Sequence, residues 1–531
     1  MRNRLPPRVE IHGSFWNGYS GGWRGSLLHA INSPMNAAFI RDRALRERYL
    51  TWWQTLPLSD AEKETLATHL TAYIQKLILN NSPDLLIWNT CQMMTTHFIQ
   101  HENWIPESEI SALEDGDVIP FESLPDTLEI VGKQAAKHLA VLKLNGGLGT
   151  TMGCSGPKSL IHVHLNDTFI DIISKQMHTL RQQTGHAIPL ILLNSFNTSD
   201  ATLAHLSDMP FLELFQHEIP RIDTETGKPY VCHRDKNLEW YPPGHGDLYL
   251  SLLTSGMLDT LIQKGIGYLF VSNADNLGAT THLKLLGHMH EKKIPFMMEV
   301  TPKTLTDIKG GTLIRHQNRV CLLERAQVAP EFLDTFEDLA RFTVFNTNSV
   351  WINLDILKQR LTQGPLKLPV IVNPKQVHGT HVVQLEQALG AAIQAFDGAV
   401  AITVPRDRFV PVKTTADLML LQSDYYTKRL DGSLQPASQR GLPTVILSKE
   451  FSNVSAYQQR VVYPPSLKHC HYLRLDGDIT LLDRVKFEGH VHLHVPPTQH
   501  VVLENKTFKN CRVRVDKQGQ LYEAPWTPDS T

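Results

Sequence analysis

The sequence has no long apolar run and little cysteine. No stretch of about 18 apolar residues occurs in the 531-residue chain, so no membrane-spanning helix is expected. The basic first residues are not followed by an apolar segment of signal-peptide type. The six cysteines are far apart and form no CxxC pair, which argues against a zinc site or a disulfide framework. We therefore expect a cytoplasmic protein with reduced thiols.

The chain also lacks an excess of charge of either sign. Lysine and arginine number 51, aspartate and glutamate 53, and the formal net charge is -2. Such a balance gives no general attraction to nucleic acid or to an anionic membrane, and neither is expected as a partner. Phosphate chemistry would have to come from local groups of basic residues. Hydrophobic residues make up 42% of the chain, enough for globular cores, and the length predicts two or three domains.

Residues 1–125 differ from the rest in their tryptophan content and their spacing. They hold six of the nine tryptophans. Apolar residues recur at helical spacing from Ala61 to Leu79, after a candidate N-cap at Ser59 or Asp60. We interpret this part as a mainly helical N-terminal region.

Residues 126–430 show short apolar runs that alternate with helical stretches. The runs end at Leu144, Leu193, Val271 and Val300, and glycine or polar residues follow each of them. This alternation is typical of βα units and predicts a Rossmann-like α/β domain with a mixed, largely parallel sheet. Ligands of such sheets bind beyond the carboxyl ends of the strands.

Residues 431–531 favour short strands instead. A polar stretch rich in Gly, Pro and Ser, Asp431–Pro443, indicates a linker. Apolar and polar residues then alternate with period two in Val485–Val495 and in Cys511–Val515. Closely spaced strands predict a small β-solenoid or a sandwich, and the pattern alone does not choose between them.

The segment Leu144–Ser159 carries the strongest chemical signal. Five glycines fall between Asn145 and Gly156, directly after a predicted strand. Backbone N–H groups that no side chain crowds can bind a polyphosphate, and Lys158 adds a positive charge beside them. We interpret the segment as a phosphate-binding loop.

Two common phosphate loops do not fit this segment. A dinucleotide fingerprint GxGxxG that starts at Gly147 needs a glycine where Met152 stands. A Walker A loop needs a glycine directly before its lysine, and Pro157 precedes Lys158. The loop is therefore of a different kind.

Further motifs follow the loop in a fixed order. Together with the loop they are Val141–Ser159, Leu193–Thr198, Trp240–Asp247, Ser272–Gly278, Glu299–Thr304, Lys309–Leu313, Phe345–Asn348 and Pro411–Leu418. In these motifs the sequence resembles the eukaryotic-type UTP–glucose-1-phosphate uridylyltransferases (UDP-glucose pyrophosphorylases). The resemblance implies a central nucleotidyltransferase domain and a C-terminal left-handed β-helix. It also implies Mg²⁺-dependent formation of UDP-glucose and pyrophosphate from UTP and glucose 1-phosphate, by attack of the sugar phosphate on the α-phosphate of UTP.

The resemblance assigns roles to individual residues. It implies catalytic roles for Lys158 and Lys413 and a metal-binding role for Asp275. The implied nucleotide-binding residues are Leu144, Asn145, Gly146, Gly147, Lys158, Gln216, Gly244, Asp275 and Lys413. The implied substrate-binding residues are His245, Asn273, Thr301, Gly311, Glu324, Asn346 and Asn348.

Three alternatives stay open at this point. The first is a pyrophosphorylase for another sugar, such as N-acetylhexosamine 1-phosphate, or one of broad specificity. Those relatives typically have an Arg soon after the Gly-Thr of the loop, where this chain has Thr151 and Met152. The second is a non-catalytic scaffold, although Lys158, Lys413 and Asp275 are all present. The third concerns assembly, since the resemblance allows a homo-oligomer through the C-terminal domain.

Overall fold

The computed structural model describes most of the chain between residues 104 and 527. The described residues are 59, 84–97, 104–149, 152–154, 156–164, 167–206, 210–305, 307–429, 433–436, 442–516 and 518–527. Most of the predicted helical region 1–125 lies outside them, including the helical pattern at 61–79. Its described part contains the helix α4 (Asp84–Thr95) and the strand β1 (Val118–Pro120).

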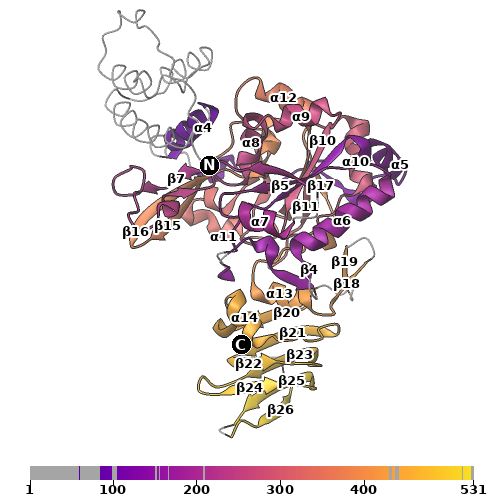
Figure 1. The fold of residues 1–531 in the computed structure, drawn as a ribbon, viewed down its shortest axis with the longest axis vertical. Helices are drawn as coiled ribbons and strands as arrows, with labels where there is room; N and C mark the ends of the chain where they lie inside the picture. Colours follow the sequence, from indigo (N-terminus) through magenta and orange to yellow (C-terminus); the bar gives the residue numbers. More distant parts are fainter. Residues whose placement is uncertain are drawn as a thin grey trace, which may run out of the picture.

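A mixed sheet of eight strands forms the centre of the described structure (Figure 1). Its strand β14 runs antiparallel to both of its neighbours, and all other neighbouring pairs are parallel. The prediction of a largely parallel α/β sheet is therefore confirmed. In spatial order the strands are β1, β17 (Val400–Thr403), β11 (Phe296–Pro302), β14 (Val344–Asn353), β10 (Tyr268–Asn273), β2 (Leu139–Leu144), β5 (Leu190–Asn194) and β6 (Leu212–Phe215).

Helices cover both faces of this sheet, which explains why its strands are continuous apolar runs. Along β2, Leu139 and Val141 belong to one hydrophobic core while Ala140 and Leu142 belong to the other. The first core includes residues of α5 (Leu128–Ala135), α6 (Phe169–Thr184) and α10 (Leu283–Lys292). The second includes residues of α8 (Leu248–Thr254), α9 (Met257–Gln263) and α12 (Leu354–Leu361). In the described part of the chain, no helix is long and apolar enough to cross a membrane.

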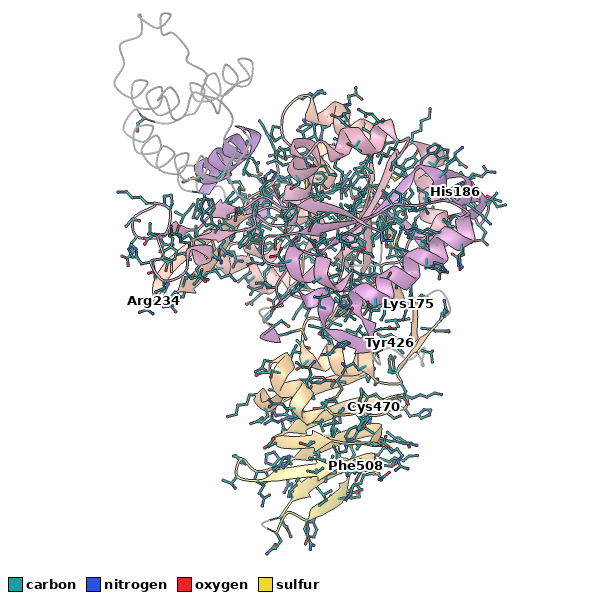
Figure 2. The ribbon with its side chains drawn as sticks, in the orientation of Figure 1. Lys175, His186, Arg234, Tyr426, Cys470 and Phe508 are labelled. Carbon is teal, nitrogen blue, oxygen red and sulfur yellow. The ribbon has the colours of Figure 1, made fainter. Side chains whose placement is uncertain are left out.

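Smaller sheets extend the central domain toward one side. The hairpin of β15 (Ile371–Val377) and β16 (Thr380–Glu386) pairs with β8 (Ile222–Asp223) and forms an arm beside β7 (Ile219–Pro220). Arg234 lies at the end of this arm (Figure 2). Other short pairs are β3 (His162–His164) with β4 (Asp167–Thr168), β7 with β9 (Trp240–Tyr241), and β12 (Thr312–His316) with β13 (Arg319–Leu323).

The C-terminal part is a stack of parallel strands below the central domain (Figure 1). β20 (Thr444–Leu447), β21 (Cys470–Asp476), β23 (Lys486–His494) and β25 (Thr507–Val515) pair in parallel in that order, and β26 (Leu521–Pro525) closes the sheet antiparallel. β22 (Asp478–Leu481) pairs in parallel with β24 (His500–Leu503). Parallel pairing between successive segments is the arrangement of a solenoid and not of an antiparallel sandwich, and the inward residues Cys470 and Phe508 are buried (Figure 2).

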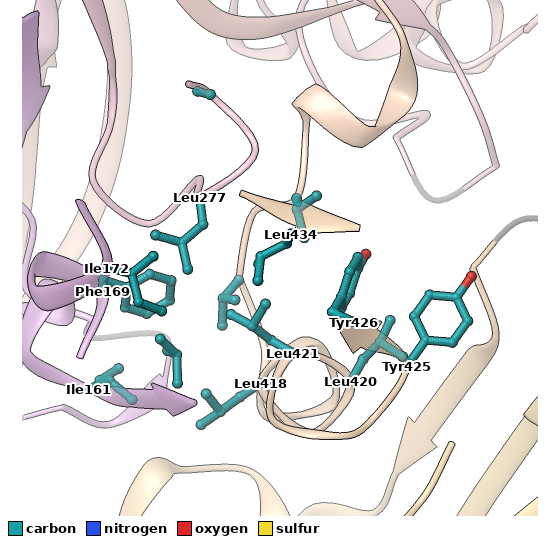
Figure 3. Packing of buried hydrophobic residues seen from close by; sticks show 14 of the residues in the cluster. Ile161, Phe169, Ile172, Leu277, Leu418, Leu420, Leu421, Tyr425, Tyr426 and Leu434 are labelled. Carbon is teal, nitrogen blue, oxygen red and sulfur yellow. The ribbon is translucent and has the colours of Figure 1, made fainter. Parts of the chain in front are cut away.

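The helix α13 (Thr415–Gln422) joins the central domain to this stack. It begins with a capping box in which Thr414 and Asp417 each accept a backbone N–H of the other. Its buried residues Leu418 and Leu421 face Phe169 and Ile172 of α6 (Figure 3). The predicted linker 431–443 lies largely outside the described residues, and its described part includes β19 (Leu434–Pro436), which pairs with β18 (Tyr426–Lys428).

Candidate nucleotide and sugar-phosphate site

The glycine loop folds back on itself after β2. Leu148 forms a bridge with Pro157, and the N–H groups of Met152 and Cys154 both donate to the carbonyl oxygen of Gly149, at 2.9 and 3.1 Å. The Met152 side chain is fully buried and anchors the loop to the first core. These contacts join the described residues of the loop to one another and to the core, which lowers the conformational entropy that ligand binding would cost.

Lys158 and Asp275 meet across the ends of two neighbouring strands. β2 and β10 are adjacent and parallel, so the segments that follow them lie at the same edge of the sheet. Lys158 Nζ lies 2.6 Å from Asp275 Oδ2, and both side chains are partly exposed, 17% and 20%. The pair presents a cation that can bind phosphate and a carboxylate that can bind a metal ion.

A cleft of about 580 Å³ opens at this edge. It contains ten of the residues that sequence analysis predicted, and Lys413, Thr301, Gly311, Glu324, Asn346 and Asn348 are not among its lining residues. The lining residues are Leu144, Asn145, Gly146, Gly147, Leu148, Lys158, Ser159, Leu193, Asn197, Gln216, Arg221, Tyr241, Pro242, Gly244, His245, Asn273, Ala274, Asp275, Lys375, Gln376, Val377, Gln384 and Glu386.

One end of the cleft holds an amide side chain in a fixed orientation. Gln216 Nε2 donates to the carbonyl oxygen of Gly244 at 3.0 Å. Its Oε1 lies only 1.9 Å from the position that a Cβ at Gly146 would occupy. Gly244 itself has φ +84°, and a Cβ there would lie 2.6 Å from the carbonyl oxygen of Gln387. Glycine at 146 therefore leaves room for the Gln216 amide, and glycine at 244 allows the close approach of the Gln387 backbone.

His245 lines the same cleft as a neutral hydrogen-bond donor. Its Nδ1 accepts the backbone N–H of Leu389 at 2.8 Å, so the ring proton is on Nε2. Burial lowers the pKa of His245 to about 4. An uncharged imidazole can donate one hydrogen bond to a phosphate oxygen but brings no positive charge.

Asn145 uses its side chain inside the protein. Its Nδ2 donates to Asn194 Oδ1 at 2.7 Å and to Thr202 Oγ1 at 3.0 Å, and the residue is 4% exposed. The backbone N–H of Asn145 also donates within the protein, to the carbonyl oxygen of Leu193 at 2.8 Å, so Asn145 holds the start of the loop in place.

The remaining predicted residues form a second group linked to the cleft through Asn348. Asn348 Nδ2 donates to Asn273 Oδ1 at 2.7 Å, and the Asn348 N–H donates to Asn346 Oδ1 at 2.9 Å. The Asn346 N–H in turn donates to the carbonyl oxygen of Gly311 at 2.9 Å. A Cβ at Gly311 would lie 2.6 Å from Glu324 Oε1, so glycine leaves room for that carboxyl group.

Glu324 has an unusual carboxyl group within this second group. Burial raises its pKa to about 7, although a hydrogen bond from Asn346 and the charge of Lys413 act in the opposite direction. Lys413 Nζ lies 5.5 Å from the centre of the Phe345 ring. Thr301, fully buried on β11, has a hydroxyl oxygen without a hydrogen-bond partner among the described residues. Carboxyl, amide, ammonium and hydroxyl groups are the kinds that bind sugar hydroxyls, although the Thr301 hydroxyl is enclosed by the protein.

Sequence analysis missed the wall of the cleft that the arm provides. Arg221 donates to the carbonyl oxygens of Leu238 and of Trp240, the latter at 2.6 Å, and fixes the segment before Gly244. Tyr241 Oη donates to the carbonyl oxygen of Leu385 at 3.1 Å and so ties this segment to β16. Tyr241 lies within the motif Trp240–Asp247, and that position was the available signal, whereas Arg221 lies outside the motifs named above.

An α/β sheet with a phosphate-type glycine loop, a paired lysine and carboxylate, and a fixed amide in one cleft has the architecture of a nucleotidyltransferase. A family model described as UTP–glucose-1-phosphate uridylyltransferase matches residues 89–488. The enzyme of that name from Solanum tuberosum is 42% identical over 82% of this chain and 93% of its own length. The Pyrus pyrifolia enzyme is 44% identical over 74% of this chain and 85% of its own.

Solved structures agree with these relatives. A UDP-glucose phosphorylase from Trypanosoma brucei superposes with a TM-score of 0.77 at 36% identity, covering 85% of this chain and 100% of its own. A variant of the Leishmania major UDP-glucose pyrophosphorylase, solved in complex with UDP-glucose, gives 0.77 at 32% identity, covering 84% and 99%. The chain belongs to the UTP–glucose-1-phosphate uridylyltransferase family.

Proposed function

We propose that this protein makes UDP-glucose and pyrophosphate from UTP and glucose 1-phosphate. The observation that carries the proposal is the Lys158–Asp275 pair. It lines the same cleft as the glycine loop, in a chain that belongs to this family. The related Leishmania major protein has been solved with UDP-glucose, which supports a nucleotide sugar as the product.

The lining of the cleft would orient UTP, with the uracil at one end and the phosphates at the glycine loop. The Gln216 amide, held against Gly146 and Gly244, offers a donor and an acceptor at one end, and this suits a uracil edge. The glycine loop with Leu144, Asn145 and Gly147 faces the phosphates, with Lys158 beside them. The second group, with Glu324 and Asn346, would take the glucose. His245 and Asn273 line the cleft, and Asn273 is bonded to Asn348 of the second group.

The reaction needs two anions to be brought together. A phosphate oxygen of the sugar attacks the α-phosphate of UTP, and pyrophosphate leaves. Negative charge develops at the α-phosphate, so positioning and electrostatic stabilisation supply most of the rate. Lys158 and Lys413 are the proposed catalytic residues, since ammonium groups can offset that charge without any covalent intermediate.

The oxygen ligands at Asp275 fit Mg²⁺. Among the described residues no group of three or more metal-ligating side chains occurs. A single carboxylate is nevertheless the usual protein share of a Mg²⁺ site in nucleotide enzymes, because phosphate oxygens and water supply the other ligands. When bound there, Mg²⁺ would neutralise phosphate charge. Lys158, which pairs with Asp275, would add its own positive charge beside the phosphates.

The finer parts of the architecture belong to the same proposal. We assign residues 1–125 to an N-terminal region, 126–430 to the catalytic domain and 431–531 to a C-terminal left-handed β-helix. The parallel pairing of β20, β21, β23 and β25 supports the β-helix. A homo-oligomer assembled through this domain stays a prediction that light scattering tests.

Pyrophosphate release tests the function directly. The purified chain is given UTP, Mg²⁺ and one of three sugar phosphates: glucose 1-phosphate, galactose 1-phosphate or N-acetylglucosamine 1-phosphate. We expect turnover to be fastest with glucose 1-phosphate and to stop in excess chelator. Equal or faster turnover with N-acetylglucosamine 1-phosphate would contradict the assignment to glucose, and no turnover with any of them would favour a scaffold.

A further inference from the structure

Two of the charged side chains proposed to act at the phosphates, Asp275 and Lys413, come from separate segments. Asp275 lies in residues 273–280, between β10 and α10, and Lys413 lies in residues 406–414, between β17 and α13. We call these the Asp275 segment and the Lys413 segment. Only Asn273, at the end of β10, and the short 3-10 helix Arg406–Arg408 are regular structure in these segments. Other contacts must therefore set the relative position of the two segments.

Asn276, directly after Asp275, joins the two segments. Its Nδ2 donates to the carbonyl oxygen of Arg408 at 3.2 Å, and its Oδ1 accepts the N–H of Val410 at 2.9 Å. Its backbone also forms a bridge with Pro411. Asn276 is 1% exposed, so both arms of its amide bind the Lys413 segment away from water. A primary amide suits this position because it donates to a carbonyl and accepts an N–H through two separate atoms.

A buried ion pair between Arg408 and Glu299 also holds the two segments together. Arg408 Nε and Nη2 lie 2.8 Å from Glu299 Oε2 and Oε1, and Trp351 Nε1 also donates to Glu299 at 2.8 Å. Arg408 Nη2 donates further to the carbonyl oxygen of Thr280 at 2.9 Å, within the Asp275 segment. One guanidinium therefore ties both segments to β11, in the planar two-bond geometry that fixes orientation best.

Lys143 holds the Asp275 segment from the other side. Its Nζ donates to Ser272 Oγ at 2.7 Å and to the carbonyl oxygen of Ala279 at 2.8 Å, so it links the residue just before the segment to a residue near its end. Lys143 is 2% exposed on β2, next to Leu144 of the phosphate loop. A Cβ at Gly278 would lie 2.4 Å from the carbonyl oxygen of Asp407, which shows how closely the two backbones approach.

We propose that Asn276 is a positioning residue for uridylyl transfer, which sets the placement of Asp275 relative to Lys413 through the buried contacts with Arg408 and Val410. The inference rests on the proposed function. None of these three partners in the contact, Asn276, Arg408 and Val410, lines the cleft, so they act on the reaction through the residues they place. Small displacements of groups that stabilise a transition state cost rate far more than they cost substrate binding.

The test is Asn276→Ala, with Asn276→Asp as the second variant. Asp keeps the size and the acceptor for Val410, but it loses the donor to the Arg408 carbonyl. We expect kcat for UDP-glucose formation to fall about tenfold to a hundredfold in both variants. The affinity for UMP, whose base would lie at the Gln216 end and which lacks the two leaving phosphates, should change less than about twofold, and the Mg²⁺ concentration for half-maximal rate should rise.

The matched control is Gln359→Ala, which removes an exposed amide from α12 and should leave kcat, UMP affinity and melting temperature unchanged. Wild-type kcat in Asn276→Ala would overturn the inference and leave the proposed function intact. A parallel loss of UMP affinity and melting temperature in both variants would also overturn it, because it would show a merely structural role. A wild-type chain that makes no UDP-glucose would overturn the proposed function and the inference with it.

Discussion

Buried ionisable side chains distinguish this site from a solvated cleft. His245 is kept neutral because burial lowers its pKa to about 4, and burial raises the pKa of Glu324 to about 7. In both cases the uncharged form is favoured, as expected where a low-dielectric environment opposes charge. The positive charge offered to the transferring phosphate therefore comes from lysines, Lys158 and Lys413 in our proposal, and not from the imidazole.

Glu324 gives a prediction about stability and pH. Its folded-state pKa, about 7, is above the ordinary value of 4.5, so its contribution to folding is fully present below pH 4.5 and is lost as pH rises through 7. Glu324→Gln mimics the neutral acid and should keep this contribution to stability as the pH rises. We expect the variant to be more stable than the wild type at pH 8, by up to about 3 kcal/mol, with little difference at pH 4.5.

Thermal unfolding of both proteins at the two pH values measures this effect. Glu331→Gln, an exposed carboxyl group, is the control and should show no such difference. If Glu324→Gln changes stability equally at both pH values, ionisation of Glu324 is not the cause.

The elements of the fold were largely predictable from the sequence. The runs ending at Leu144, Leu193, Val271 and Val300 became β2, β5, β10 and β11, because strands buried on both faces must be apolar throughout. The polar residues after these strands gather at one edge because the four strands run in the same direction.

The arm and the second group could not be predicted in this way. Arg221 and Glu386 reach the cleft only because β8 pairs with β16, two strands that are far apart in the sequence. The antiparallel strand β14 places Asn346 and Asn348 between β10 and β11, and no local pattern in its apolar sequence states its direction. Their roles came from the resemblance alone.

The glycine loop gives a prediction at the scale of an element. In Gly146→Ala the new methyl group would lie 1.9 Å from Gln216 Oε1 and must displace that amide. The loop and its phosphate contacts should persist. We expect KM for UTP to rise about tenfold, the worth of roughly one hydrogen bond, with a smaller preference for UTP over CTP.

Gly156→Ala is the matched control in the same loop. A Cβ at Gly156 meets no atom within 4 Å, so KM and base preference should stay at wild-type values. Steady-state rates with UTP and CTP measure both variants. An unchanged KM in Gly146→Ala would show that Gln216 does not contact the base.

At the scale of the whole molecule, the C-terminal stack and the central domain share one hydrophobic core. Leu418 and Leu421 of α13, seen in Figure 3, belong to the same cluster as Tyr457 and Leu467 beyond the linker. Polar contacts reinforce the junction, since Tyr457 Oη donates to Gln422 Oε1 at 2.7 Å. A Cβ at Gly153, in the glycine loop, would lie 2.7 Å from the Cβ of Asn453, so the stack also touches the phosphate loop.

Removal of residues 431–531 should therefore harm the catalytic domain and not merely its assembly. The truncated chain would expose the apolar side of α13, so we expect a lower melting temperature. Because α13 begins two residues after Lys413, we also expect at least about a tenfold loss of kcat. The control ends at Asp516 and removes little beyond the edge strand β26, far from the junction, so kcat should be retained. Differential scanning fluorimetry, light scattering and pyrophosphate release on both chains separate the outcomes. A truncated chain that is smaller in assembly but fully active and equally stable would show that the stack serves oligomerisation alone, and that the shared core adds nothing to the placement of Lys413.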